Sequence, residues 1–465
     1  MSQPLALPKR SPAALHLVLC LCLADWLFWQ GDSGGFALAL YLVILVLTAR
    51  LAHPSRPDET ADSDACLVLA LGLLPLLEHL QLLSVIFAVA GAVLAALRLY
   101  LGRDGWRLGR ALVRLLARVP VLALIDTGRG AADVIDAVSQ TRINWRVYIL
   151  PGVLAVAFAS LILLANPVID AWMSNIRFGG LQVDPGRFWL LLSVALASWP
   201  ILSLGTHGQA LGAPGTRNWQ ARRPFLSANS VAQALMLFNA MFAVQTWMDM
   251  TYLLSPGQLP AGMSYAEYAH RGAYPLIGLA LLAGVFMLAS TPFLDERRDL
   301  KPLLMLWLGQ TVFLTMGSAW RLVLYVEAYG LTYLRLRAAV WLLIVAIGLF
   351  VLGLQIWHRR TRIWAVLRIA LATAVVLYAS AFANFAEVIA RWNLSDPNIA
   401  SRDLHYVARL GPMASVPIAR FEATHGPREA LQYARAPEIN DWREWGFRSA
   451  RINAKLAAIR SETEE

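Results

Sequence analysis

Charged residues are scarce in this chain of 465 residues. They make up 15% of it, whereas they approach a quarter of an ordinary soluble domain. Hydrophobic residues reach 58% and mean hydropathy is +0.54. This balance excludes a typical soluble globular protein and predicts a chain that lies in lipid. The net charge of +10 comes from arginines that flank apolar runs, so nucleic acid is not an expected partner.

Cysteine is rare too, and the motifs of several enzyme classes are missing. The three cysteines lie in or beside apolar runs without a C-x-x-C pair or a histidine cluster, which predicts small buried hydrophobes. The sequence has no G-x-x-x-x-G-K-[ST], H-E-x-x-H or dinucleotide fingerprint. We therefore expect no cofactor, no metal and no catalytic residue of those classes.

One short segment matches the active-site motif of an enzyme class. Residues 31–35 spell G-D-S-G-G, the sequence around the nucleophile of chymotrypsin-like proteases. That chemistry needs a histidine and an aspartate placed by β-barrels, whereas this pentapeptide joins two apolar runs. We interpret it as a hairpin turn.

The dominant feature of the sequence is a series of long apolar runs. About 20 apolar residues cross the hydrocarbon core as a helix, and about eleven such runs occur. The expected fold is an all-α, multi-pass transmembrane bundle with a small C-terminal helical extramembrane domain. The runs are 13–30, 35–51, 65–79, 81–100, 147–166, 187–206, 231–254, 274–294, 302–328, 337–357 and 363–388.

The runs and their flanks predict four regions and an orientation. Residues 1–102 form N-terminal membrane hairpins, 103–146 a basic cytoplasmic segment, 147–388 the main bundle and 389–465 the C-terminal domain. Lysine and arginine alternate between loops so that the N-terminus is cytoplasmic and the C-terminal domain periplasmic, in a bacterial inner membrane. Arg335 and Arg337 violate that alternation.

Arginines recur every three or four residues in 103–119, as on one face of a helix, with leucines opposite. This pattern is typical of a helix in the membrane interface whose arginines meet anionic headgroups. A helix packed on the protein's own cytoplasmic surface fits equally well. The arginines are Arg103, Arg107, Arg110, Arg114 and Arg118.

The ninth run carries charge through an apolar stretch. Gln310, Arg321 and Tyr325 share one helix face, while Glu327 lies about 120° from Arg321. Charges within a membrane span usually face the bundle interior or a wet cavity. This polar cluster is therefore either a functional site or a set of structural contacts within the bundle.

The seventh run offers partners for that cluster. Gln245 and Asp249 lie one turn apart, and pairing Asp249 with Arg321 would offset the cost of two lone charges in lipid. An outer loop follows, which is either an interfacial helix or a vestibule wall. Its polar residues are Tyr265, Glu267, Tyr268 and Arg271.

Two long segments resemble a bacterial family of polytopic inner-membrane proteins that is classed as a domain of unknown function. They are S-Y-A-E-Y-A-x-R-G at 264–272 and W-R-L-x-L-Y-x-x-A-Y-G-L-T-x-L-R at 320–335, and the similarity continues through 238–246, 384–393 and 403–410. The resemblance covers about the C-terminal half, and the first 145 residues match nothing. It implies a multi-pass membrane location and no activity.

The leading hypothesis is therefore a non-catalytic sensory, regulatory or envelope-binding membrane protein. Its expected partners are membrane lipids with anionic headgroups, and an envelope or protein partner at the C-terminal domain. A transporter or lipid-handling permease is the alternative. An integral-membrane transferase ranks third, with Asp25, Glu327 and Glu387 as its candidate acids or bases.

Overall fold

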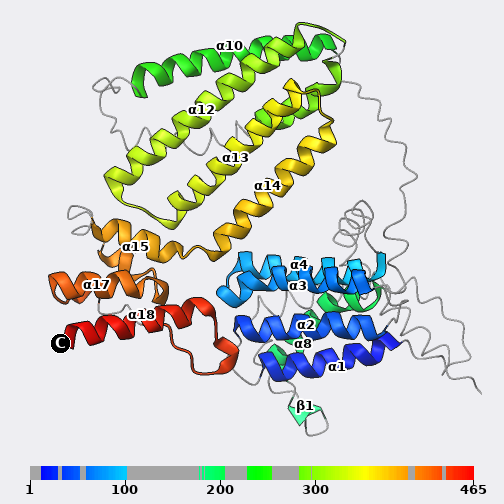
Figure 1. Cartoon of the computed structure of the whole chain (residues 1–465), viewed down its shortest axis with the longest axis vertical. Helices are drawn as coiled ribbons and strands as arrows, with labels where there is room; N and C mark the ends of the chain where they lie inside the picture. Colours follow the sequence, from blue (N-terminus) through cyan, green and yellow to red (C-terminus); the bar gives the residue numbers. More distant parts are fainter. Residues whose placement is uncertain are drawn as a thin grey trace, which may run out of the picture. The chain divides into compact units, whose positions relative to one another are not determined.

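The computed structural model of the chain describes residues 12–29, 34–52, 59–101, 177–178, 181–182, 184–204, 228–253, 282–294, 296–395, 404–431 and 436–464 (Figure 1). The predicted helical class is confirmed over these residues, apart from a two-residue antiparallel ladder between β1 (Arg177–Phe178) and β2 (Leu181–Gln182). The chain divides into two compact units. Unit 1 comprises Met1–Arg217 and Ile439–Ala450, and unit 2 comprises Asn218–Glu438 and Arg451–Glu465.

The described part of unit 1 consists mainly of apolar helices. Helices α3 and α4 approach closely where Gly72 faces Gly91, because a Cβ on Gly72 would lie 2.7 Å from the Gly91 Cα. Asp25 and Arg187 join α1 to α8 through a bidentate ion pair at 2.6 and 2.5 Å. The helices are α1 (Pro12–Phe28), α2 (Gly35–Ala52), α3 (Glu59–Glu78), α4 (Leu82–Leu101) and α8 (Pro185–Leu202).

A C-terminal segment packs on the hairpin turns of unit 1. Arg443, in the short helix η4 (Trp442–Glu444), is 8% exposed and lies over the Trp26 ring at 5.1 Å. A Cβ on Gly34 would lie 2.2 Å from the Arg443 carbonyl oxygen, so position 34 needs glycine for this close backbone contact. We call residues 441–448 the strap.

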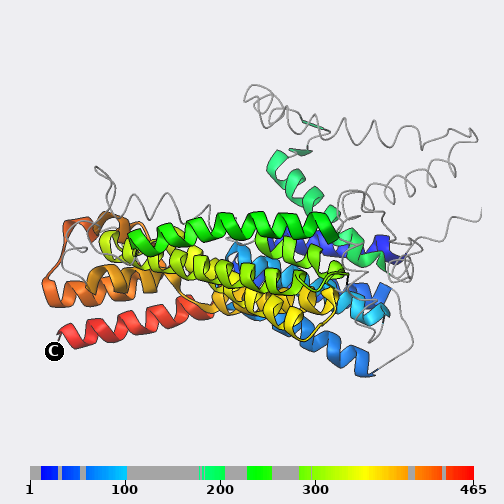
Figure 2. The same cartoon turned by 90° about the horizontal axis from the view of Figure 1, so that it is seen from above.

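Unit 2 holds the longest helices. Figures 1 and 2 show α12, α13 and α14 side by side, and α10 packs against α12. Their common core includes Leu304, Trp307 and Leu352. The helices are α10 (Ala228–Leu253), α12 (Leu300–Tyr329), α13 (Tyr333–Trp357), α14 (Arg362–Phe382), α15 (Phe385–Ser395), α17 (Ser415–His425) and α18 (Phe447–Glu464, whose first residues belong to unit 1).

The outer faces of these helices are apolar. Val366, Leu371 and Val375 of α14 are between 50% and 59% exposed, which suits contact with acyl chains rather than with water. Four helices of the described residues are long and apolar enough to cross a membrane, where the sequence predicted about eleven spans in the whole chain. They are Leu82–Tyr100, Leu300–Tyr329, Tyr333–Trp357 and Arg362–Phe382.

The last predicted span, 363–388, is wrong at its end. Helix α14 stops at Phe382, Ala383 is extended, and α15 begins at Phe385. Asn384 starts the new helix because its Oδ1 accepts from the Glu387 N–H at 3.3 Å, as an N-cap residue does. The N-x-x-E spacing was readable in the sequence.

Candidate functional site

The polar residues of α12 lie on its buried side. Thr311, Thr315 and Ser318 each donate to the carbonyl four residues earlier, which satisfies their hydroxyls without a partner helix. Arg321 is 2% exposed, whereas Glu327 is exposed. Glu327 therefore lies away from the buried polar residues of its own helix.

Two amides link α10 to α12 in the middle of the helices. Asn239 is 7% exposed, and its Nδ2 donates to the Leu235 carbonyl at 2.8 Å and the Leu303 carbonyl at 3.1 Å. Gln310 Nε2 donates to the Asn239 carbonyl at 3.2 Å. These bonds fix the register of the two helices.

That register bears on the expected Arg321–Asp249 pair. Helices α10 and α12 run in the same direction, since Arg297 also bonds Asn229 near the start of α10. Asp249 lies about 15 Å beyond Asn239 along α10, and Arg321 about 16 Å beyond Gln310 along α12. The two residues are thus at one level, while the side chains of Asp249 and Gln245 lie outside the described residues, so the pairing stays a prediction.

The turn between α12 and α13 is clamped by α15. Asn393 is fully buried, its Oδ1 accepts from the Leu331 N–H at 2.7 Å, and its Nδ2 donates to the Leu331 carbonyl at 3.0 Å. Thr332 then caps α13 by accepting from the Arg335 N–H. One side chain satisfies both backbone groups of a buried turn residue, which locks the turn in place.

The two arginines that violated the charge alternation cover the same turn. Arg335 donates to the carbonyls of Tyr329 and Gly330 at the end of α12, and its guanidinium lies 4.1 Å from the centre of the Tyr325 ring. Arg337 lies over the Tyr333 ring at 5.8 Å. Cations at a helix C-terminus and over aromatic faces are stabilised locally, which explains both positions without reversing the orientation.

Three of the segments that carry the family resemblance meet at this turn. Tyr406 accepts the Tyr333 N–H at 3.0 Å, and Asn384 donates to the Met413 carbonyl at 2.8 Å. We call this packed group the node. Its buried residues are Leu331, Ala386, Ile389, Ala390, Val407, Leu410, Ala414, Ile418 and Leu431.

A groove of about 400 Å³ opens between α15 and α17, on the surface of the node. Its lining combines cationic and hydroxyl side chains with apolar ones. A carboxylate attached to a partly apolar group suits such a lining. The lining residues are Arg391, Leu394, Ser395, Val416, Pro417, Arg420, Phe421, Thr424 and His425.

The histidine of the groove is held by its neighbours on α17. His425 stacks on Phe421 with ring centres 4.4 Å apart, and its Nδ1 lies 2.7 Å from Thr424 Oγ1 and 3.2 Å from the Phe421 carbonyl. These contacts engage Nδ1 and fix the plane of the ring at the groove. Arg391 is anchored by Glu387 at 2.8 Å, with its own side chain 66% exposed.

Carboxylates suited to transferase chemistry are engaged elsewhere. Asp25 binds Arg187, and Glu387 binds Arg391. Among the described residues no three His, Cys, Asp or Glu side chains lie close enough to hold a metal ion. The outer-loop residues Tyr265, Glu267, Tyr268 and Arg271, and the basic helix predicted over 103–119, lie outside the described residues.

Long apolar helices with apolar outer faces identify a membrane protein. The chain belongs to the family described as Domain of unknown function (DUF4153), whose model matches residues 65–421. The match extends the resemblance seen in the C-terminal half back to residue 65. The chain has no detectable similarity to a curated protein or to a solved structure.

Proposed function

We propose that this is a non-catalytic, multi-pass protein of the bacterial inner membrane that binds a carboxylate-bearing component of the cell envelope in the groove between α15 and α17. The observation that carries the proposal is the placement of Arg391, Arg420 and His425 around one groove on the packed node. Packed support matters because a site held in place loses less free energy to ordering when it binds.

The path of the chain supports an outer location for this groove. Helix α12 ends and α13 begins at the node, α14 then crosses once more, and α15 follows it. The groove therefore lies on the side of the α12–α13 turn, opposite the basic residues 297–301 and 359–362. With those residues in the cytoplasm, the groove faces the periplasm.

Cysteine labelling tests this orientation. In a variant without native cysteines, Ser461→Cys in exposed α18 should react with a membrane-impermeant maleimide in intact spheroplasts, whereas Ser55→Cys should react only after permeabilisation. Residue 55 belongs to a loop expected in the cytoplasm, and residue 461 to the C-terminal region expected outside. If only the cysteine at residue 55 reacted in intact spheroplasts, the orientation would be the opposite of the one proposed.

Groove binding is tested with soluble muropeptides, whose peptides end in free carboxylates, and the purified full-length protein in nanodiscs. Arg420→Gln should weaken binding about tenfold, because a lost charge-assisted hydrogen bond costs about 1.5 kcal/mol or more. Isothermal titration calorimetry gives the affinity. Arg428→Gln, an exposed arginine outside the groove, serves as the matched control and should change nothing.

Neutral oligomers of N-acetylglucosamine supply the second control. They share the sugar backbone but lack carboxylates, so their binding should be undetectable. Equal affinity for neutral and carboxylate-bearing ligands, or equal losses in Arg420→Gln and Arg428→Gln, would contradict the groove as a carboxylate site.

A transporter or lipid-handling permease is the second candidate, favoured by the buried amides between α10 and α12. Asn239 Oδ1 and Gln310 Oε1 are buried without a hydrogen-bond partner among the described residues. Unsatisfied acceptors in mid-span are costly and often line a solute path. Against this, α12 and α13 continue unbroken over 30 and 25 residues, whereas transporters commonly bind solute at interrupted helices.

A further inference from the structure

The exposed aromatic side chains in the described part of unit 1 gather at one end of its helices. The Asp25–Arg187 ion pair holds the start of α8 beside the end of α1, so residues from several elements meet there. Each of these aromatic side chains is between 36% and 51% exposed, and we call them the aromatic cluster. They are Trp26 and Trp29 at the end of α1, Phe36 in the first turn of α2, Phe188 in the first turn of α8, and Trp442 and Phe447 in the strap.

The strap holds part of this cluster together through ring contacts. The centre of the Trp442 ring lies 6.0 Å from that of Trp26 and 5.8 Å from that of Phe36. The Arg443 guanidinium lies 5.1 Å from the centre of the Trp26 ring and 5.5 Å from that of Trp442, at distances where cation–π attraction acts. The rings therefore pack on one another and still present much of their apolar surface outward.

The aromatic cluster lies at one end of a helix that can cross a membrane. The apolar part of α4, Leu82–Tyr100, has 19 residues and is about 28 Å long, close to the ~30 Å thickness of the hydrocarbon core. The strap contacts the chain just before α4 begins, since a Cβ on Gly446 would lie 3.4 Å from the carbonyl oxygens of Leu77 and Glu78. With α4 across the bilayer, the strap lies at the boundary between hydrocarbon and water.

Exposed side chains change in kind along the helices of unit 1. Beyond the aromatic end they are aliphatic, as with Leu47 of α2 at 56% and Val89 of α4 at 43%. The last turn of α4 carries Arg98, which pairs with Asp64 of α3 at 2.5 Å. The order from aromatic through aliphatic to charged residues is the one expected of helices whose aromatic end lies in a membrane interface.

We infer that the aromatic cluster anchors unit 1 in the headgroup region of the membrane, so that its partner is the surface of the phospholipid bilayer. A tryptophan there places its ring against acyl chains and its indole N–H among polar groups. In water the same rings would leave apolar area exposed at a cost in free energy. Lipid is the occupant that the position favours, because the cluster continues the aliphatic surface of α2 and α4.

The strap is then an interfacial segment rather than part of a domain in water. Which leaflet holds it follows from the orientation proposed above. The anchoring itself depends neither on that orientation nor on the groove between α15 and α17.

Spin labelling of the full-length protein in phosphatidylcholine liposomes tests the anchor. In a variant without native cysteines, a nitroxide is attached to Phe447→Cys in the strap, to Val89→Cys in α4 or to Ser461→Cys in exposed α18. Power-saturation spectroscopy compares collisions with oxygen, which concentrates in the bilayer, and with a water-soluble nickel chelate. The ratio of oxygen to nickel collisions at Phe447 should be several-fold above that at Ser461 and below that at Val89, because headgroups lie between hydrocarbon and water.

Phe36→Cys gives a second measurement of the cluster from a different element, and each labelled variant should melt close to the native protein. Ratios at Phe447 and Phe36 equal to the ratio at Ser461 would place the cluster in water and overturn the anchor. Low collision rates with both reagents at these two positions would show that protein covers the cluster, which also overturns it. An interfacial ratio in a protein whose groove binds no muropeptide would contradict the proposed function alone.

Discussion

Replacing Asn393 with leucine should lower the free energy of unfolding by about 2 to 5 kcal/mol, one of the two largest effects expected of a single substitution here. Asn393 is fully buried, and its side chain bonds both the N–H and the carbonyl of Leu331, at 2.7 and 3.0 Å. Leucine has nearly the same volume, so the cost arises from two buried backbone groups left without partners. Denaturant unfolding of the detergent-solubilised protein measures it.

Hydrogen exchange separates a local clamp from general destabilisation. The Leu331 amide should exchange much faster in Asn393→Leu, because its acceptor is gone, while amides in the middle of α13 keep their protection. Asn440→Leu is the control, since Asn440 is exposed and bonds Glu444 through its backbone N–H, and it should change stability by no more than about 0.5 kcal/mol. If the Leu331 amide exchanged at the same rate in Asn393→Leu as in the native protein, the proposed role of Asn393 in holding the turn would be wrong.

The long spans were predictable because lipid imposes a simple rule on sequence. Apolar runs at 302–328 and 337–357 became α12 at Leu300–Tyr329 and α13 at Tyr333–Trp357. The errors lie at the ends, where single side chains decide. Thr332 caps α13 and so starts it four residues early, and Asn384 divides the last predicted span into α14 and α15.

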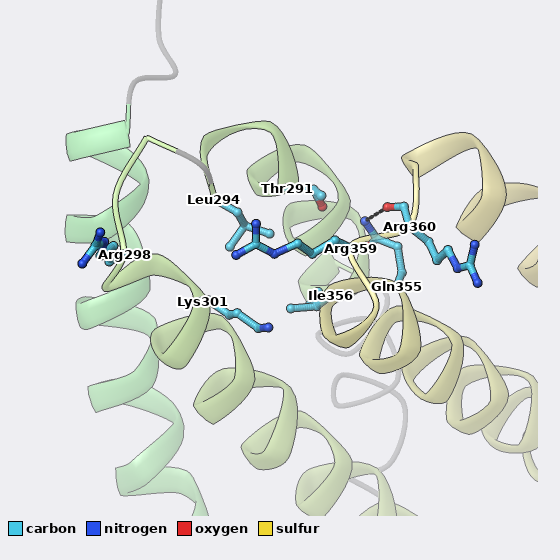
Figure 3. Close-up of a pocket in the computed structure, with 8 residues that line it drawn as sticks. All are labelled: Thr291, Leu294, Arg298, Lys301, Gln355, Ile356, Arg359 and Arg360. Carbon is cyan, nitrogen blue, oxygen red and sulfur yellow. Dashed lines mark hydrogen bonds between the residues drawn. The ribbon is translucent and has the colours of Figure 1, made fainter.

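The node and its groove could not be read from the sequence. Segments 320–335, 384–393 and 403–410 carried the family resemblance, yet nothing in their spacing shows that Asn393 reaches Leu331 or that Tyr406 reaches Tyr333. Contacts between residues more than 60 positions apart depend on how helices pack, which a one-dimensional pattern does not record. The basic pocket lined by Lys301 and Arg359 (Figure 3) was missed for the same reason, because its cations come from two separate segments, 298–301 and 359–360.

The strap shows a further limit of reasoning from sequence. The sequence predicted a turn over 31–35, most of which lies outside the described residues, but the reason for glycine at position 34 lies more than 400 residues away, at the Arg443 carbonyl. Ile439–Ala450, late in the chain, belongs to the same compact unit as the N-terminal helices. The strap is therefore part of unit 1.

A buried ion pair fastens the strap to unit 1. Arg448 Nε lies 3.3 Å from Glu78 Oε1, and the two side chains are 5% and 7% exposed. Removing one partner leaves the other charge buried without its counter-charge. Glu78→Gln and Arg448→Met should therefore each lower the free energy of unfolding by about 3 to 5 kcal/mol.

The double variant separates coupling from general damage. Glu78→Gln with Arg448→Met removes both charges, so it should recover a large part of the loss, as coupled positions do. Asp62→Asn breaks the Arg50–Asp62 pair, whose side chains are 23% and 46% exposed, and should cost no more than about 1 kcal/mol. Thermal unfolding gives the stabilities, and limited proteolysis should release residues 439–465 early in the single variants. Strict additivity of the two substitutions, or a Glu78→Gln variant no weaker than Asp62→Asn, would show that the strap is held by its tryptophans rather than by the ion pair.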